Sequence, residues 1–156
     1  IINCTFLAET NLIKYFNFKK PRIAIAGINP HAGEDGSMGN EEMSIIAPAV
    51  NHLIEKGVNV KGPFAPDSLF SEKARKNYDI VICMYHDQGL IPIKAIDFEE
   101  TVNVSIGLPF IRTSPDHGTG IDIAGTGEAS EKSLVEAIKT VKTMHIGSKR
   151  ELLTVN

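Results

Sequence analysis

Strand-like and helix-like segments alternate along this chain, and this alternation predicts an α/β fold with a largely parallel or mixed sheet. Short β-branched runs at residues 22–26 and 80–84 are typical of buried strands. Apolar residues recur at helical spacing in residues 43–54 and again in residues 134–144. Apolar residues make up 42% of the chain and charged residues 22%, which is an ordinary globular composition.

The remaining elements follow from shorter patterns. Residues 4–18 carry apolar side chains in a weakly helical pattern, and residues 67–76 favour a short helix. Further strands are expected at residues 58–61, 101–106 and 110–113. In α/β sheets, ligands collect in the loops beyond the carboxyl ends of the strands. We therefore expect the chemistry of this protein in those loops.

The first strand is followed by a glycine-rich loop and then by a helix. Asn40 is expected to cap that helix, with Glu41 and Glu42 in its first turn, where the helix dipole favours acids. Pro48 either kinks the helix or lies in the first turn of a helix that begins near Ala47. The apolar positions of this helix are Met43, Ile46, Val50, Leu53 and Ile54.

A second helix is expected near the end of the chain. Ser130 is its predicted cap, and Gly147 is expected to end it. Its apolar positions are Leu134, Ala137, Ile138, Val141 and Met144.

Charge and cysteine content exclude several classes of protein. The 156 residues carry a net charge of −3 with no long basic run, so neither nucleic acid nor an anionic membrane is expected as a partner. Cys4 and Cys83 give neither a disulfide framework nor a CxxC metal motif. No apolar stretch approaches the length that spans a bilayer, and we find no signal peptide. The cytoplasm is the expected compartment.

Two histidines follow predicted strands at equivalent positions. His31 lies in the loop after the first strand, and His86 follows the strand at residues 80–84. Imidazole is a common ligand of zinc and its neighbours, so the two could converge on one divalent metal, with a third ligand from elsewhere. Asp87 could orient His86, bind the metal or act as a base. The alternative is that each histidine only fills a loop or the core.

Three further polar side chains lie near strand ends. Lys94, Asn103 and Arg112 form a set suited to a phosphate and a carboxylate, although each by itself could be an ordinary surface residue. Asp67 could instead simply cap a helix.

A glycine-rich segment at residues 116–125 has a different character. Its spacing is not the GxGxxG dinucleotide fingerprint, but its backbone N–H groups could hold a phosphate or a nucleotide. Asp122 could accept hydrogen bonds from ribose hydroxyls. The alternative is an ordered connecting loop.

Four motifs occur in order along the chain: GINPHAGEDG, GPFAPDSLF, MYHDQGLIPIK and VNVSIGLPFIRTSPDHGTGIDIAGTG. From about Arg22 to near Gly147 they resemble the second half of the 4-hydroxythreonine-4-phosphate dehydrogenase family. The last loop also resembles the adenosine-binding loop of the isocitrate and isopropylmalate dehydrogenases. The resemblance implies their fold, with α/β/α layers around a mixed sheet.

The resemblance assigns roles to individual residues. His31 and His86 resemble metal ligands, and the family's third histidine lies upstream of this chain. Lys94, Asn103 and Arg112 resemble substrate-binding positions. Asp67 and Asp87 match acidic positions near the metal, and either they or Lys94 would handle protons. The nucleotide loop of the family matches His117, Gly118, Thr119 and Asp122.

The activity that the resemblance implies is NAD-dependent and needs a divalent metal. It is the oxidation and decarboxylation of 4-phosphooxy-L-threonine to 3-amino-2-oxopropyl phosphate, in the synthesis of vitamin B6 (pyridoxal 5'-phosphate). Asp122 favours NAD over NADP, because a carboxylate beside the ribose would repel a 2′-phosphate. Imidazole ligation favours zinc or cobalt over magnesium.

The resemblance also implies that this chain is part of a larger assembly. Residues 1–156 are expected to form one α/β unit that lacks the family's N-terminal domain, with a closing helix at residues 130–156 that packs on that domain. The family is expected to be a homodimer whose active site lies at the subunit interface. The fragment alone is expected to be inactive.

Three alternatives stay open. The first is a sister dehydrogenase for a related four-carbon phosphorylated acid, such as threonate or erythronate 4-phosphate. The second is a catalytically incomplete module for metal binding or dimerisation. The third is a metal hydrolase that uses two histidines and an aspartate, which would leave the loop HGTGIDIAGTG unexplained.

Overall fold

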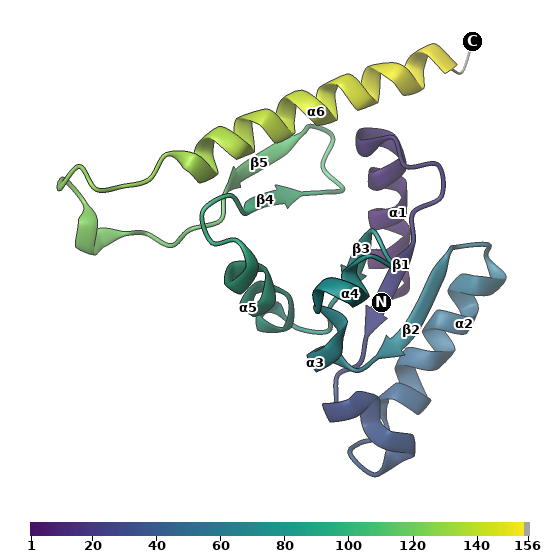
Figure 1. Ribbon diagram of the computed structural model, residues 1–156. Coiled ribbons are helices and arrows are strands. Elements are labelled where there is room, and N and C mark those ends of the chain that lie inside the picture. The colour runs from purple at the N-terminus through teal and green to yellow at the C-terminus, as the bar shows by residue number, and fades with distance from the viewer. Residues whose placement is uncertain (155–156) are drawn as a thin grey trace. The chain divides into compact units, whose positions relative to one another are not determined.

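The computed structural model describes residues 1–154, with side chains as far as Lys149. Contacts divide the chain into two compact units, and Figure 1 labels their elements. Unit 1 comprises Ile1–Ile13 and Phe18–Pro92, and unit 2 comprises Lys14–Asn17 and the residues from Ile93 onward. This division is finer than the single α/β unit expected over residues 1–156.

Unit 1 contains most of the elements. In chain order they are α1 (Ile2–Phe16), β1 (Ile23–Ala26), η1 (Pro30–Gly36), η2 (Glu42–Ile46), α2 (Ala47–Glu55), β2 (Val60–Phe64), α3 (Pro66–Leu69), α4 (Glu72–Arg75), β3 (Ile80–Ile82) and α5 (His86–Ile96). The last turns of α1 and of α5 belong to unit 2. Unit 2 continues with β4 (Val102–Ser105), β5 (Arg112–Pro115), η3 (Ile121–Ile123) and α6 (Lys132–Thr154).

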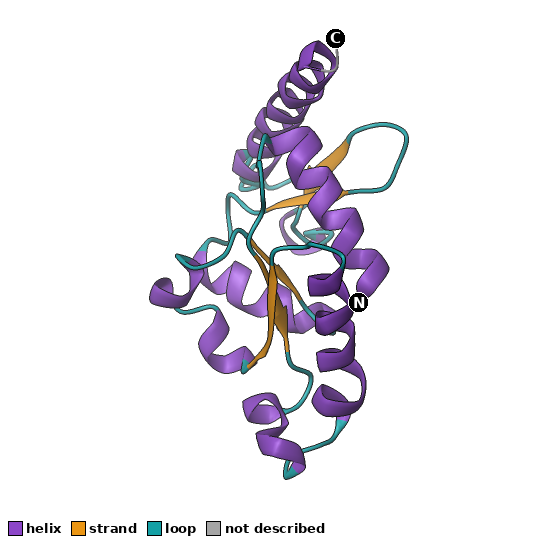
Figure 2. Cartoon of the chain, turned by 90° about the vertical axis from the view of Figure 1, so that its right-hand side faces the viewer, coloured by secondary structure: helices purple, strands orange, loops and turns teal. Residues whose placement is uncertain are grey.

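The sheet of unit 1 is parallel and has the strand order β2-β1-β3. Ile23 of the central strand pairs with Val60 of β2 and with Ile80 of β3. All four residues of β1 are buried, which is why this strand has no polar alternation. Figure 2 shows helices on both sides of these strands, as is usual for a parallel sheet. The predicted α/β architecture is confirmed for this unit.

One face of β1 packs under α3. Ala24 and Ala26 form a buried cluster with Leu69, and Tyr78 and Val81 pack against it. Because side chains alternate along a strand, Ile23 and Ile25 point to the opposite face of the sheet.

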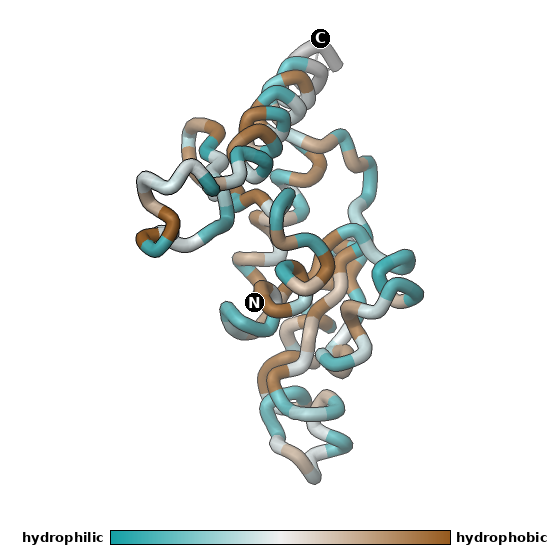
Figure 3. Tube along the Cα trace, turned by 60° about the vertical axis from the view of Figure 1, so that its left-hand side comes forward, coloured by the Kyte–Doolittle hydropathy of each residue, from teal (hydrophilic) through white to brown (hydrophobic). Residues whose placement is uncertain are grey.

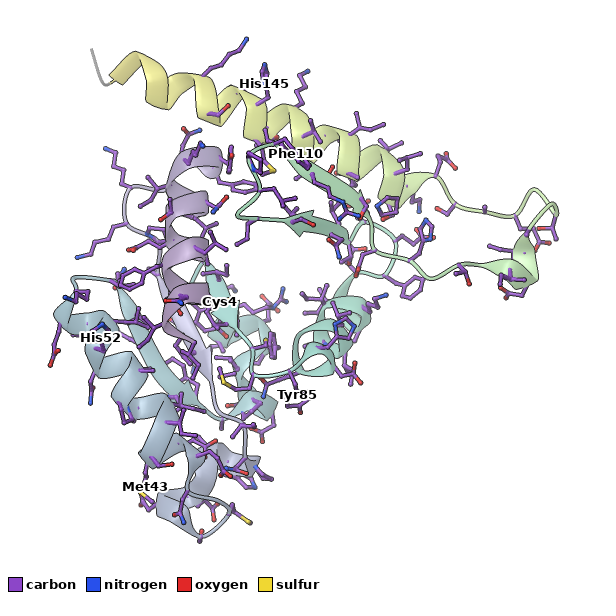
Figure 4. All side chains as sticks on the ribbon, turned by 180° about the vertical axis from the view of Figure 1, so that it is seen from behind. Cys4, Met43, His52, Tyr85, Phe110 and His145 are labelled. Atoms are coloured by element: carbon purple, nitrogen blue, oxygen red, sulfur yellow. The ribbon has the colours of Figure 1, made fainter. Side chains whose placement is uncertain are left out.

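The helix after the glycine-rich loop differs from the prediction at its start. A π-helical turn, η2, runs directly into α2, and Ile46 and Ala47 at the junction both have right-handed helical φ and ψ. Pro48 is near the start of α2 but lies inside this continuous helical run, next to the π-helical turn. The N-cap of η2 is Glu41 rather than the predicted Asn40, and it makes no side-chain capping bond. Glu42 is 3% exposed, whereas Met43 is 52% exposed and projects outward in Figure 4. The acid, not the methionine, faces the interior here.

Two further segments differ from the prediction. The helix expected at residues 67–76 is two short helices, α3 and α4, with Ser71 capping the second one. The segment that follows β3 is helical, so His86 and Asp87 lie in the first turn of α5 rather than in a loop.

In unit 2, a two-stranded antiparallel sheet packs against α6. Asn103 pairs with Ser114, and Ser105 pairs with Arg112. Thr113, on the other face of the ribbon, donates a hydrogen bond to the carbonyl of Ala137 in α6 at 2.9 Å. Parallel and antiparallel pairs therefore lie in two separate sheets of the described chain, where one mixed sheet was expected.

Helix α6 does not end at Gly147, which corrects the sequence-based expectation. A Cβ at this position would overlap the backbone carbonyl of Tyr15, a residue of the same unit. The glycine therefore serves a close approach of two backbones rather than a helix end.

Brown and teal alternate along α6, the helix that ends at C in Figure 3. Met144 is buried, whereas the apolar side chains of Leu134, Ile138 and Ile146 are more than 40% exposed.

Among the described residues, none of the helices combines the length and the hydropathy that crossing a membrane requires.

Candidate metal and substrate site

Two histidine-bearing segments leave adjacent strands at the same edge of the sheet. β1 and β3 are paired and parallel, with Ile25 opposite Ile82. His31 follows β1 by five residues, and His86 follows β3 by four. Both imidazoles are exposed. Tyr85, directly before His86, is 55% exposed and marks this segment in Figure 4.

The segment that carries His31 has an unusual backbone. From His31 to Asp35, five consecutive residues have positive φ, between 41° and 85°, so that η1 is a left-handed turn. Only Gly33 among them is a glycine, and each of the others costs about 1–2 kcal/mol in this conformation. Such strain persists only where the surroundings determine the backbone.

The carboxylate of Glu42 holds the backbone immediately before this segment in place. Its Oε1 accepts hydrogen bonds from the backbone N–H of Ile28 at 2.7 Å and of Asn29 at 2.8 Å. Its Oε2 accepts one from the side-chain amide of Asn29 at 2.9 Å. Burial raises the pKa of Glu42, but the hydrogen bonds from Asn29 and Ile28 outweigh it and hold the pKa below its usual range. The group is therefore ionised at neutral pH.

Gln88 connects the two histidine-bearing segments. Its side-chain amide donates to the carbonyl of Gly27, at the end of β1, at 2.7 Å. Its Oε1 accepts the N–H of Met84, just after β3, at 2.7 Å. Gln88 is 6% exposed, and its bond to Gly27 is buried while its bond to Met84 is partly buried. One side chain thus fixes the segment before His31 relative to the segment before His86.

The two candidate acids lie in unit 1. Asp87 is exposed in the first turn of α5, next to His86. Asp67 is exposed inside α3, whose N-cap is Ala65 with no side-chain bond, so the helix-cap interpretation of Asp67 is wrong. Both carboxylates face solvent.

The donor set of unit 1 suits part of a metal site. Two exposed imidazoles held on fixed backbones fit zinc or cobalt, which accept neutral histidine nitrogen. Among the residues that the structure describes, no three His, Cys, Asp or Glu side chains lie close enough together to hold a metal ion. His31 and His86 would therefore be two ligands of a site whose other ligands come from elsewhere.

The substrate-binding candidates lie in unit 2, and two of them share one face of the β4–β5 ribbon. Ser105 lies opposite Arg112, and Arg112 Nη1 donates to Ser105 Oγ at 2.8 Å. Asn103, two residues before Ser105, projects from the same face because side chains alternate along a strand. Asn103 and Arg112 are both exposed, so an amide and a guanidinium project from the same face of the ribbon, at diagonal positions.

Lys94 lies in the last turn of α5, and its ammonium group contacts the end of β5. Nζ donates to the carbonyl oxygen of Asp116 at 2.7 Å and lies 3.8 Å from the carboxylate of Asp116. The Lys94 ammonium also lies 5.5 Å from the centre of the Phe98 ring. Lys94 is thus held in place beside the ribbon that carries Asn103 and Arg112.

The candidate nucleotide loop is open. His117, Gly118, Thr119 and Asp122 are all exposed, and a Cβ at Gly118 would meet nothing within 4 Å. Gly120 has a φ of 57° and begins the short turn η3. His117 Nδ1 lies 2.9 Å from the carbonyl oxygen of Gly118, which folds the ring back on its own loop.

Sequence analysis missed Glu42 and Gln88 as buried polar residues. For Glu42 a signal exists, because residues 42, 46, 50 and 53 form one helical stripe and the other three are apolar. For Gln88 no local signal exists, because its partner Gly27 is 61 residues away.

These features define an α/β protein with histidine-bearing segments at the carboxyl ends of parallel strands. Residues 1–141 match the family described as pyridoxal phosphate biosynthetic protein PdxA. The chain belongs to this family. It is 53% identical over 144 residues to a 4-hydroxythreonine-4-phosphate dehydrogenase of Bradyrhizobium diazoefficiens, covering 92% of this chain and 42% of the relative. A protein of the same name from Desulforapulum autotrophicum is 56% identical over 133 residues, covering 85% of this chain and 39% of the relative.

Solved structures agree with this assignment. A 4-hydroxythreonine-4-phosphate dehydrogenase from Klebsiella pneumoniae matches with a TM-score of 0.75 and 49% identity, over 92% of this chain and 43% of that one. A terephthalate 1,2-cis-dihydrodiol dehydrogenase from Burkholderia xenovorans matches with a TM-score of 0.68 and 36% identity, over 88% of this chain and 43% of that one. The chain therefore spans about two-fifths of the length of the curated relatives it matches.

Proposed function

We propose that this chain is the metal- and substrate-binding half of a 4-hydroxythreonine-4-phosphate dehydrogenase. The reaction is the oxidation of 4-phosphooxy-L-threonine, with loss of carbon dioxide, to 3-amino-2-oxopropyl phosphate. The observation that carries the proposal is the pairing of two exposed histidines on segments that leave adjacent parallel strands, tied together by Gln88. Family membership and the names of the relatives support the choice of reaction.

The roles of the residues follow from their chemistry. His31 and His86 would hold zinc or cobalt, with magnesium as the weaker candidate for imidazole ligands. When bound, the metal supplies Lewis-acid polarisation of a substrate oxygen. Asp67 and Asp87, whose carboxylates are exposed, are the candidates for orienting the ligands and for accepting a proton.

Substrate binding would fall to unit 2. Arg112 and Asn103 offer a planar guanidinium and an amide to a phosphate or a carboxylate, while Lys94 adds a positive charge. Lys94 can also move a proton, and we name it with Asp67 and Asp87 among the catalytic candidates. His117, Gly118, Thr119 and Asp122 would bind NAD, with NADP disfavoured by the Asp122 carboxylate.

We further propose that the complete protein has the isocitrate and isopropylmalate dehydrogenase-like fold and is a homodimer with its active site at the subunit interface. The exposed apolar side chains of α6 support a packing partner for residues 130–156, because apolar groups on a helix are stabilised by leaving water. The proposed partner is the N-terminal domain that the relatives' additional length would provide.

The test uses the intact protein and two readouts. The parent protein is compared with His31→Ala and His86→Ala in two properties: the rate of NAD reduction with 4-phosphooxy-L-threonine, and the affinity for cobalt. Each variant is expected to lose both, whereas His52→Ala, which removes an exposed histidine of α2, should keep both. Activity and cobalt affinity that survive in the His31 and His86 variants would overturn the proposal.

A second candidate is a dehydrogenase of threonate or erythronate 4-phosphate. The likeness to the Burkholderia xenovorans enzyme favours keeping it, because that protein's name gives a different substrate for the same fold. Comparing kcat/KM among the three phosphorylated acids decides between them. Cobalt binding without turnover of any of them would instead indicate a catalytically incomplete metal-binding or dimerisation module.

A further inference from the structure

Residues 31–35, which carry His31, have a strained left-handed backbone. The backbone that leads into them is held by the side chain of Glu42. Glu42 is 3% exposed, and its carboxylate would be costly to bury without donors. The structure supplies three: the backbone N–H groups of Ile28 and Asn29 and the side-chain amide of Asn29. All three belong to the two residues that lead into Pro30 and His31.

Two glycines leave room for this carboxylate. A Cβ at Gly27 would lie 2.9 Å from Glu42 Oε1, and a Cβ at Gly33 would lie 2.7 Å from Glu42 Oε2. Gly27 precedes the left-handed segment and Gly33 is its middle residue. The segment is thus wrapped around the carboxylate, so a change in Glu42 acts first on the backbone on either side of His31.

Glu41 provides a contrast within the same turn. It accepts one hydrogen bond from the Asn29 side chain at 2.6 Å, is exposed, and bonds to no backbone N–H of residues 28–36. The two neighbouring acids therefore separate a general effect of negative charge from the bracing of this backbone.

We propose that Glu42 is a positioning residue for His31: it fixes the left-handed segment so that the imidazole is presented in the geometry that a metal ligand requires. The proposal rests on the proposed role of His31 in metal binding. Groups that hydrogen-bond directly to a metal ligand typically change metal affinity by about 10–100-fold when they are removed. Glu42 acts on His31 through the backbone of Ile28 and Asn29, and we take the same range as the expected scale.

The experiment measures two quantities in the intact protein: cobalt affinity by titration calorimetry, and amide hydrogen exchange in residues 28–36. The variants are Glu42→Ala, Glu42→Gln and the matched control Glu41→Ala, with His31→Ala as the baseline for loss of one ligand. Circular dichroism at the same temperature establishes that each variant is folded.

Glu42→Ala is expected to weaken cobalt binding about 10–100-fold and to speed exchange of the Ile28 and Asn29 amides. Glu41→Ala should stay within about twofold of the parent, because it touches only the Asn29 side chain. Glu42→Gln should lie between the parent and Glu42→Ala in both quantities, because its oxygen can still accept both backbone N–H groups but its amide NH2 faces the Asn29 donor. In a His31→Ala background, Glu42→Ala should speed exchange but weaken residual cobalt binding no further.

Contrary results separate the two proposals. Parent-like cobalt affinity in His31→Ala would refute the metal role of His31, and this inference with it. Weak binding in His31→Ala together with parent-like binding in a folded Glu42→Ala would refute the inference alone. If Glu42→Ala does not fold, Glu42→Gln decides: faster exchange with unchanged cobalt affinity would refute the positioning role, and weaker affinity with faster exchange would support it.

Discussion

The side-chain amide of Gln88 donates a hydrogen bond to the carbonyl oxygen of Gly27 at 2.7 Å, across 61 residues of sequence. The same side chain accepts the N–H of Met84. The bond to Gly27 is buried and the bond to Met84 is partly buried, and both satisfy backbone groups that lie just past the ends of strands. The side chain of Gln88 therefore links the backbone just after β1 to the backbone just after β3.

We expect Gln88→Leu to lower the free energy of unfolding by about 1–3 kcal/mol, because it leaves the buried carbonyl of Gly27 and the partly buried N–H of Met84 without partners. Urea unfolding followed by circular dichroism measures the change. Ile91→Ala is the control, since Ile91 is 67% exposed on the same helix and should change stability by less than about 0.5 kcal/mol. Equal effects of the two substitutions would contradict the bracing role of Gln88.

Gly33→Ala should destabilise more than Gly57→Ala, although both glycines have nearly the same φ, 85° and 86°. At Gly57 an added Cβ meets nothing within 4 Å, so only backbone strain of about 1 kcal/mol opposes it. At Gly33 the Cβ would also approach Gly39 O at 2.9 Å and the Glu42 carboxylate. Thermal unfolding of both variants measures the difference, and equal costs would show that contact with the carboxylate is unimportant.

Gly147→Ala should destabilise the protein, contrary to helix propensity. In an exposed helix this change would stabilise by about 1 kcal/mol. Here the new Cβ would collide with the carbonyl of Tyr15, and we expect a net loss of about 1–3 kcal/mol from overpacking. Lys142→Ala, at an exposed position of the same helix, is the control. A rise in melting temperature for Gly147→Ala would contradict the close approach.

Acid stability should depend on Asp79. Hydrogen bonds from Arg22, at 2.7–3.1 Å, hold the pKa of Asp79 below its usual range. Because the pKa is lower in the folded state, the stabilisation is complete above the unfolded-state pKa, about 3.9, and is lost as the pH falls through the folded-state pKa. Urea midpoints between pH 6 and pH 2.5 should therefore fall less steeply for Asp79→Asn than for the parent.

The control for that prediction is Glu72→Gln. Glu72 pairs with Lys76 on the surface, with both side chains more than 70% exposed, and such pairs contribute little. This variant should follow the parent's pH dependence. A parallel response of all three proteins would mean that other carboxylates set the acid limb.

The amino-acid sequence determined the strands and the helical stripes, since these depend on local periodicity. Ile23–Ala26, Ile80–Ile82 and the buried positions Ile46, Val50 and Leu53 follow from patterns within a few residues. It also placed His31 and His86 at the ends of two strands, because the carboxyl end of a buried run is visible in the sequence itself.

Features that depend on distant partners were decided by the tertiary structure. Gly147 carries the usual signal of a helix end, yet α6 continues past it, and the lack of a side chain there leaves room for the backbone of Tyr15. Glu42 was predicted in a first helical turn, where the helix dipole favours acids, and its burial against the N–H groups of Ile28 and Asn29 depends on the tertiary structure. A local pattern gives a residue's own conformational preference, whereas burial and hydrogen-bond partners depend on which other segments the fold brings to it.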